Sequence, residues 1–388
     1  MTVRRAAKRK QVAPRFPMTS KQRQFAAMRR QAPDRVPIYI RGVNPHDAAW
    51  VASRHPSFAP LIEAVDRYGD ARSGVGFGGG WLLTAADVAV AHDREPAGDW
   101  MLVTTTIHTP AGDLVSKRYD SPAGHPGMTC EFPVKTERDV ELALSIPYEP
   151  PQPPIGEWLA AVEAIGERGQ VHIGFGNPIA HVHDLLGSAL LAEWSITQRE
   201  LVARLTRIFA ERLEDILRRW LDDPRVVEPV FAASGHEYAG PPLLSPRDFR
   251  EFCTDIERPI FDRIHRRGGL LHVHCHGPMD AVIEQLAELG ADCLHPVEAP
   301  PMGDITLAQA KARVGRDVCL EGNIQMDDIF TLETRDFVKV VEAAMRDGMP
   351  EGGYILAPTA SPYTPVLADR ARDNYLAMIE TGMRMGAY

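Results

Sequence analysis

Three histidines alternate with other residues in the run from Leu270 to Gly277, which reads LLHVHCHG. Successive side chains of a β-strand point to opposite faces, so we expect His272, His274 and His276 to share one face. A neutral imidazole offers a nitrogen lone pair, which suits zinc and its neighbours in the transition series. A strand whose polar face only forms hydrogen bonds inside the protein is the alternative. Three histidines at a strand end favour a metal site over that alternative.

Other predicted strands also end in residues that can bind a metal or move a proton. Two neutral histidines and one carboxylate would make a three-ligand site with an open position, in which zinc activates a bound thiol or water. For each residue alone, a loop or capping role is the simpler explanation. Their recurrence at successive strand ends favours one common site. The candidates are His236, Glu237, His295, Glu298, Glu321 and Asn323.

These residues need a fold that brings strand ends together, and the second half of the chain supplies a suitable pattern. Strand-like and helix-like segments alternate there, which is typical of βαβ units and a parallel sheet. The number of units indicates an α/β fold of the (β/α)8 barrel type, whose active site lies where the strands end. The predicted strands are 170–176, 226–232, 270–276, 293–297, 318–321 and 354–357, and the predicted helices are 198–221, 246–267, 279–289, 307–314 and 334–347.

The first half of the chain predicts additions to this barrel. Residues 1–17 form a basic tail that we expect to be disordered, and residues 18–388 form the barrel domain with an N-terminal extension. A helix capped near Thr19 precedes a short strand at 38–40. Residues 101–107 and 114–119 predict a β-hairpin elaboration. The glycine-rich stretch 74–81 lacks a clear strand and helix around it, so it predicts a loop and only weakly a binding lip.

Composition limits the partners and the compartment. The net charge of −9 and the pI near 5.9 argue against a nucleic-acid partner. No apolar run is long enough to span a membrane, and no apolar segment follows the basic cluster as it would in a secretory signal. The five cysteines are odd in number and scattered, which fits a reducing compartment and a cytoplasmic protein.

A set of motifs, in order along the chain, resembles the uroporphyrinogen decarboxylase superfamily. The resemblance runs from about Met18 to the C-terminus and implies the (β/α)8 barrel that the strand and helix pattern also predicts. The motifs are MTSKQR at 18–23, PDRVP at 33–37, LSPRDFREF at 244–252, HCHG at 274–277, EAPPMGD at 298–304 and GNI at 322–324.

The decarboxylases of this superfamily carry an R-Q-A-G-R stretch near the N-terminus, whose arginines bind the carboxylates of the porphyrinogen. The corresponding region here, residues 29–35, reads RRQAPDR and lacks the glycine-centred motif. A tetrapyrrole with many carboxylates needs cationic partners, so this difference argues against porphyrinogen decarboxylation.

The other branch comprises the cobamide-dependent methyltransferases, and the pattern is closest to these. Their zinc is held by an H-x-C pair and a later cysteine. The resemblance aligns His274 and His276 with the pair, but no cysteine occurs near residues 356–362, where the later ligand should lie. The implied zinc ligands are therefore His274, His276 and a carboxylate, Glu237 or Glu298. Such a set makes zinc a stronger Lewis acid, suited to water, a hydroxyl or an ether oxygen.

The function that follows as a hypothesis is a metal-dependent methyltransferase acting on a small molecule, with Glu237, Glu298 and Asn323 as catalytic residues. It would transfer a methyl group to or from a corrinoid, or demethylate a methoxylated compound. The D-x-H-x-x-G signature of cobalamin binding is absent, so the corrinoid would arrive on a separate protein. The alternatives are a decarboxylase or lyase for a small carboxylated substrate, and a catalytically silent binding barrel.

Overall fold

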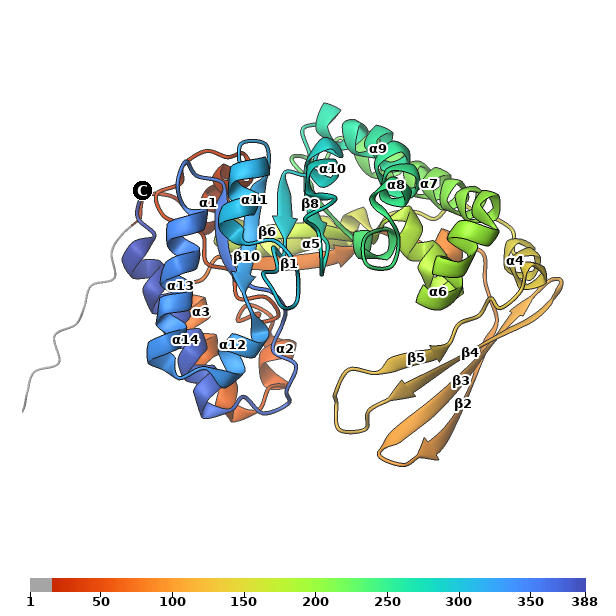
Figure 1. Ribbon diagram of the computed structural model, residues 1–388, viewed down its shortest axis with the longest axis horizontal. Coiled ribbons are helices and arrows are strands. Elements are labelled where there is room, and N and C mark those ends of the chain that lie inside the picture. The colour runs from red at the N-terminus through yellow and green to blue at the C-terminus, as the bar shows by residue number, and fades with distance from the viewer. Residues whose placement is uncertain (1–15) are drawn as a thin grey trace, which may run out of the picture.

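A curled parallel sheet of seven strands forms the centre of the computed structural model, which describes residues 16–388 (Figure 1). The predicted basic tail lies almost entirely outside these residues. Large apolar residues between the sheet and its helices make the main core. The strand order is β1 (Ala71–Gly76), β6 (Gly169–Gly176), β7 (Val230–Ser234), β8 (Leu270–His274), β9 (Cys293–His295), β10 (Cys319–Ile324) and β11 (Tyr354–Pro358).

The extended segment 36–40 lies between the two edge strands of this sheet. Ile38 forms a parallel bridge with Leu356 of β11. The carbonyl of Ile38 accepts a hydrogen bond of 2.7 Å from the backbone N–H of Asp70, the residue before β1. The predicted barrel is therefore confirmed as a curled parallel sheet surrounded by helices. An eight-stranded barrel of regular strands stays a prediction, because this segment makes a single bridge.

A buried carboxylate holds the segment in place. Asp70 accepts hydrogen bonds from Arg23 (2.7 Å), Arg35 (2.8 Å) and the backbone N–H of Ile38 (2.8 Å). Arg23 belongs to the first helix, α1 (Ser20–Met28), which Thr19 caps as predicted. The N-terminal extension is thus tied to the edge of the sheet through charge-assisted hydrogen bonds.

Amphipathic helices follow the strands. In the longest, α7 (Arg199–Asp222), Leu205, Phe209, Leu213 and Ile216 lie at helical spacing and are buried. None of the helices in residues 16–388 is long and apolar enough to cross a membrane. The other helices are α2 (Ala48–Ala52), α3 (Ala59–Tyr68), α4 (Glu137–Leu144), α5 (Ile155–Ile165), α6 (Pro178–Thr197), α8 (Pro246–Phe249), α9 (Asp255–Arg266), α10 (Ile283–Glu288), α11 (Leu307–Val314), α12 (Met326–Thr331), α13 (Thr334–Gly348) and α14 (Asp369–Met385).

A second, antiparallel sheet projects from the body of the protein (Figure 1). Its central strands β3 and β4 pair from Met101–Asp120 to Thr109–Gly112, which confirms the predicted hairpin. Two further strands that we did not predict extend the hairpin on both sides. The order is β2 (Val90–Ala97), β3 (Trp100–Thr109), β4 (Gly112–Asp120) and β5 (Met128–Glu131).

The prediction of a loop at 74–81 is wrong in its first part. Residues 74–76 end strand β1, which pairs in parallel with β6 along its whole length. Glycine is a poor strand former, so local composition favoured a loop. The neighbouring strand supplies the hydrogen bonds that override this preference.

Candidate functional site

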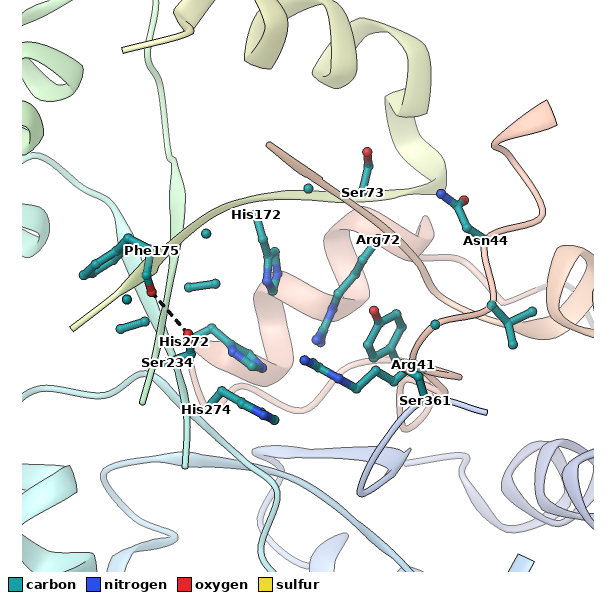
Figure 2. A pocket seen from close by; sticks show the side chains of 18 of the residues that line it. Arg41, Asn44, Arg72, Ser73, His172, Phe175, Ser234, His272, His274 and Ser361 are labelled. Carbon is teal, nitrogen blue, oxygen red and sulfur yellow. Dashed lines mark hydrogen bonds between the residues drawn. The ribbon is translucent and has the colours of Figure 1, made fainter. Parts of the chain in front are cut away.

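A cavity of about 670 Å³ extends from the ends of β6, β7 and β8 into the interior of the curled sheet. Figure 2 shows Arg41 and Arg72 pointing from one side toward His172, His272 and His274. In (β/α)8 barrels the active site lies at the carboxyl ends of the strands, so the cavity lies where the sequence predicts the active site. Of the predicted metal ligands, His274 lines this cavity.

A chain of hydrogen bonds fixes which nitrogen of His274 carries the proton. Nε2 of His295 lies 3.1 Å from the carbonyl oxygen of Pro358, which only accepts, so this nitrogen is protonated. Burial lowers the pKa of His295 to about 3, so its ring is neutral and its Nδ1 is an acceptor. Nδ1 of His274 lies 2.8 Å from that atom and must donate to it. The Nε2 lone pair of His274 is consequently free to bind a metal.

His276 also has an acceptor next to its Nδ1 atom, which in this case is a carboxylate. Its Nδ1 lies 3.2 Å from Oε2 of Glu298, which also accepts a bond of 2.7 Å from the backbone N–H of Gly277. Burial opposes ionisation of Glu298, but the hydrogen bonds from His276 and Gly277 lower its pKa. Glu298 therefore holds the ring of His276 through Nδ1, which leaves Nε2 as the atom that could face a metal. Carboxylate and imidazole partners of this kind commonly orient metal-binding histidines.

His274 and His276 do not share the face of one regular strand as expected. Strand β8 ends at His274, and the backbone of Cys275 then bonds to the carbonyl oxygen of His295. His276 lies in the loop, with its ring nearly perpendicular to that of His274 and the two ring centres 4.5 Å apart. Cys275 is buried in the core, away from the cavity.

Glu237 lies in the short helical turn after β7, next to the end of β8. Its Oε2 atom is buried and has no hydrogen-bond partner. Burial raises the pKa of Cys275, and the charges of Glu237 and Glu298 raise it further, which puts both carboxylates near this cysteine. The adjacent His236 turns the other way and pairs at 2.9 Å with Glu257 of α9, so it takes no part in the site.

Deeper in the sheet, another group of potential ligands comes together. The donor atoms of His272, Cys293 and Glu321 lie within 4.8 Å of one another, and they form the one such group of three or more among residues 16–388. Arg72 makes a bidentate pair with Glu321 at 2.7 and 2.9 Å. Because a guanidinium already neutralises this carboxylate, and burial raises the pKa of the Cys293 thiol, the group is better explained as a buried ion pair.

The predicted polar residues thus fall into pairs: His274 with His295, His276 with Glu298, and His272 with Glu321. Asn323 is half-buried on β10, two residues after Glu321 and nearer the carboxyl end of the strand, and it is not among the residues that line the cavity. The expected set of His274, His276 and Glu237 is not among the groups whose donor atoms lie within 4.8 Å in the described part of the chain.

The sequence predictions missed the cations of the cavity, Arg41 and Arg72, and the imidazole of His172. Arg41 directly follows the short strand predicted at 38–40. The rule used for the histidines, that residues after strands face the active site, would have found it. Arg72 and His172 lie within strands, where alternation alone does not tell a polar interior position from a surface one.

Comparisons with known proteins agree with this architecture. A statistical model of the uroporphyrinogen decarboxylase family matches residues 99–381. A methyltransferase from Methanosarcina mazei has a similar structure, with 16% identity, a TM-score of 0.59, and coverage of 94% of this chain and 98% of that one.

Two other solved structures are less similar. A Bacteroidetes-affiliated GH5 cellulase has a TM-score of 0.36 at 14% identity and covers 59% of this chain and 73% of its own. A D-psicose 3-epimerase from Clostridium cellulolyticum H10 has a TM-score of 0.34 at 10% identity, with 60% and 83% covered. No curated protein sequence matches the chain.

Proposed function

Because the chain belongs to the uroporphyrinogen decarboxylase family, we propose that the cavity is the active site of a metal-dependent methyltransferase for a small molecule. The observation that carries the proposal is the pair of imidazoles of His274 and His276, each held through its Nδ1 atom by an acceptor, so that metal binding would use the Nε2 atoms. The methyltransferase from Methanosarcina mazei supports the choice within the family through its similar fold.

In this proposal the metal is zinc, and its ligands would be His274, His276 and Glu237, whose donor atoms are not all within 4.8 Å of one another and would have to move closer on metal binding. The donor set suits zinc, which accepts imidazole nitrogen and carboxylate oxygen and keeps an open position in catalytic sites. The orphaned Oε2 atom of Glu237 fits this role, since a buried acceptor without a donor needs a cation or proton. When bound, zinc would polarise the substrate heteroatom that carries or receives the methyl group.

Other residues hold the imidazoles in position. His295 accepts the Nδ1 proton of His274, and Glu298 accepts that of His276, so both rings keep the tautomer that a metal requires. Asn323, near the carboxyl end of β10, would offer its amide to the substrate.

The methyl group would pass between the substrate heteroatom and the cobalt of a corrinoid. We assign the corrinoid to a separate partner protein that meets the open end of the cavity. Five free cysteines, four of them buried, suit the reducing cytoplasm, which we propose as the compartment.

The experiment starts with protein purified without added metal. We expect about one zinc ion per chain by mass spectrometry, loss of this zinc in His274→Ala, and retention of it in the matched control His92→Ala, since His92 is exposed on β2. Addition of a methyl acceptor and methylcobalamin should change the visible spectrum of the corrinoid as it loses its methyl group. Absence of any transition metal would refute the proposal.

A carboxy-lyase is the second candidate, and one observation favours it. Arg41 and Arg72 line the cavity, and guanidinium groups bind carboxylates well. Release of carbon dioxide from a small carboxylic acid, without any change in the methylcobalamin spectrum, would favour the lyase over the methyltransferase.

A further inference from the structure

The cavity is hollow on the side of β1, β6 and β7 because the residues there are small. Gly74 of β1, Gly174 and Gly176 of β6, and Ala232 and Ser234 of β7 all line it. Gly174 pairs with Ala232, and Gly176 pairs with Ser234. Gly74 pairs with His172, so the imidazole of His172 borders these small residues on β6. We call the five small residues the glycine wall.

The backbone does not require glycine at the centre of this wall. Neither Gly74 nor Gly174 has a positive φ angle. A Cβ atom at Gly74 would approach nothing closer than 3.7 Å, and one at Gly174 nothing closer than 3.9 Å. Glycine inside a strand lowers stability and often marks a place where a ligand approaches the backbone closely. The absence of side chains at Gly74 and Gly174 therefore leaves open space in the cavity.

Arg41 brings a positive charge to this space. Within residues 16–388, no carboxylate oxygen lies within 4.0 Å of its guanidinium nitrogens, whereas Arg72 beside it is neutralised by Glu321. Figure 2 shows Arg41 directed into the cavity from the side opposite His272 and His274. A half-buried guanidinium without a counter-ion is a ready partner for an anion.

We propose that the substrate is a planar carboxylic acid of the aromatic class, held by Arg41 through its carboxylate and lying with its ring against the glycine wall. This inference rests on the proposed function and names the substrate class of the same site. A planar ring can lie against the exposed backbone of these small residues at van der Waals distance, whereas the axial hydrogens of a puckered ring keep it further away. The volume of about 670 Å³ lies within the range of small-molecule sites, roughly 300–1,000 Å³.

The charge of the site selects a carboxylate over a phosphate. One free guanidinium matches the single charge and the two oxygens of a carboxylate. A phosphate dianion would need a further cation, and the carboxylate of Glu321 already occupies Arg72.

Isothermal titration calorimetry with four probes tests the proposal: benzoate, benzamide, cyclohexanecarboxylate and phenyl phosphate. The full-length protein is used as purified and again after chelation. Benzoate should bind with a stoichiometry of one. Benzamide, which lacks the charge, and cyclohexanecarboxylate, which lacks the planar ring, should each bind about tenfold more weakly or less. Phenyl phosphate should bind more weakly than benzoate.

Two variants test which residues contact the carboxylate and the ring of benzoate. Arg41→Gln should weaken benzoate binding about tenfold or more and abolish its preference over benzamide. Gly174→Val fills the wall and should weaken benzoate while the melting temperature without ligand does not fall. Arg225→Gln is the matched control, because Arg225 is exposed and pairs with Asp223 away from the cavity. It should bind benzoate as the wild type does.

Failure of benzoate to bind the wild type, equal binding of benzamide, or tighter binding of phenyl phosphate would overturn this inference. These results are separable from the methyltransferase proposal. Benzoate binding without zinc or methyl transfer contradicts only the proposed function. Zinc and methyl transfer without benzoate binding contradict only the substrate class.

Discussion

The Nδ1 atoms of His274 and His295 lie 2.8 Å apart, and a single proton lies between them. The carbonyl of Pro358 fixes the proton of His295 on its far nitrogen, so His274 donates the shared proton. A backbone carbonyl on β11 thereby sets the metal-binding state of a side chain on β8 through one intervening ring.

The first prediction concerns a substitution that replaces the imidazole of His295 with a ring that contains no nitrogen. In His295→Phe, His274 loses the acceptor for its Nδ1 proton and can adopt the other tautomer. We expect zinc affinity to fall about 10–100-fold, as is usual for partners of metal ligands. Competition with a chromophoric chelator measures it, with His92→Phe as the control. Unchanged affinity would show that the hydrogen bond does not orient His274.

The second prediction concerns the unpartnered carboxylate. Glu237→Gln keeps the shape of the side chain but removes the negative charge, so zinc affinity should fall by about tenfold or more. The melting temperature of the chelated protein should stay the same or rise, because the wild-type oxygen has no donor to lose. Glu157→Gln on α5, an exposed position, serves as the control. A loss of stability together with normal zinc binding would indicate a structural role instead.

The third prediction tests the anchor of the N-terminal extension. Asp70→Ala leaves Arg23 and Arg35 buried without their shared partner. We expect the free energy of unfolding to fall by about 3–5 kcal/mol, as when one member of a buried ion pair is removed. Urea denaturation followed by circular dichroism measures this.

The matched control is Asp66→Ala, because Asp66 is exposed and lies 3.6 Å from His46. Its effect should stay below about 1 kcal/mol, the usual limit for surface pairs. Similar effects of the two substitutions would contradict the anchoring role of Asp70.

The fourth prediction is a dependence of stability on pH that comes from His181 on α6. Burial lowers the pKa of His181 to about 4. Between this value and the ordinary value near 6.5, the unfolded chain binds the proton and the folded protein does not, so stability is complete above pH 6.5 and falls as the pH drops. The loss at pH 5 should be roughly 2 kcal/mol from this group.

Urea midpoints at pH 7 and pH 5 check this dependence, with chelator present so that zinc release does not contribute. His181→Gln should have a smaller difference between the two midpoints than the wild type. Exposed His108 on the β3–β4 hairpin gives the matched control, His108→Gln. An equal pH dependence in all three proteins would exclude His181 as the source.

The sequence predicts the helices and strands better than it predicts which residues contact one another. The alternation of strands and helices after residue 170 is local, and the structure confirms it because each strand carries its own β-branched and apolar residues. The strand at 71–76 was missed because three of its features are non-local. Its hydrogen bonds come from β6, Gly74 faces a cavity, and the charge of Arg72 is neutralised by Glu321 of β10.

In the candidate site, too, the sequence predicts the residues but not the contacts between them. The histidines at 272, 274 and 276 are visible as a pattern, and His274 does reach the cavity. Which partner each one meets depends on loop geometry. His236 follows β7 and His295 is the last residue of β9, yet His236 turns toward Glu257 and His295 toward His274. Strand ends alone do not distinguish these outcomes.

The bidentate pair between Arg72 and Glu321 has a consequence for the order of folding. The two residues are 249 positions apart in the chain. During synthesis, Arg72 emerges long before Glu321, so a compact state of the preceding chain has Gln24 as a partner for Arg72 but lacks its carboxylate. Closing such a long loop is slow, because its entropy cost precedes the contacts that compensate for it. The ion pair at the centre of the sheet can therefore form only after residue 321 has been synthesised.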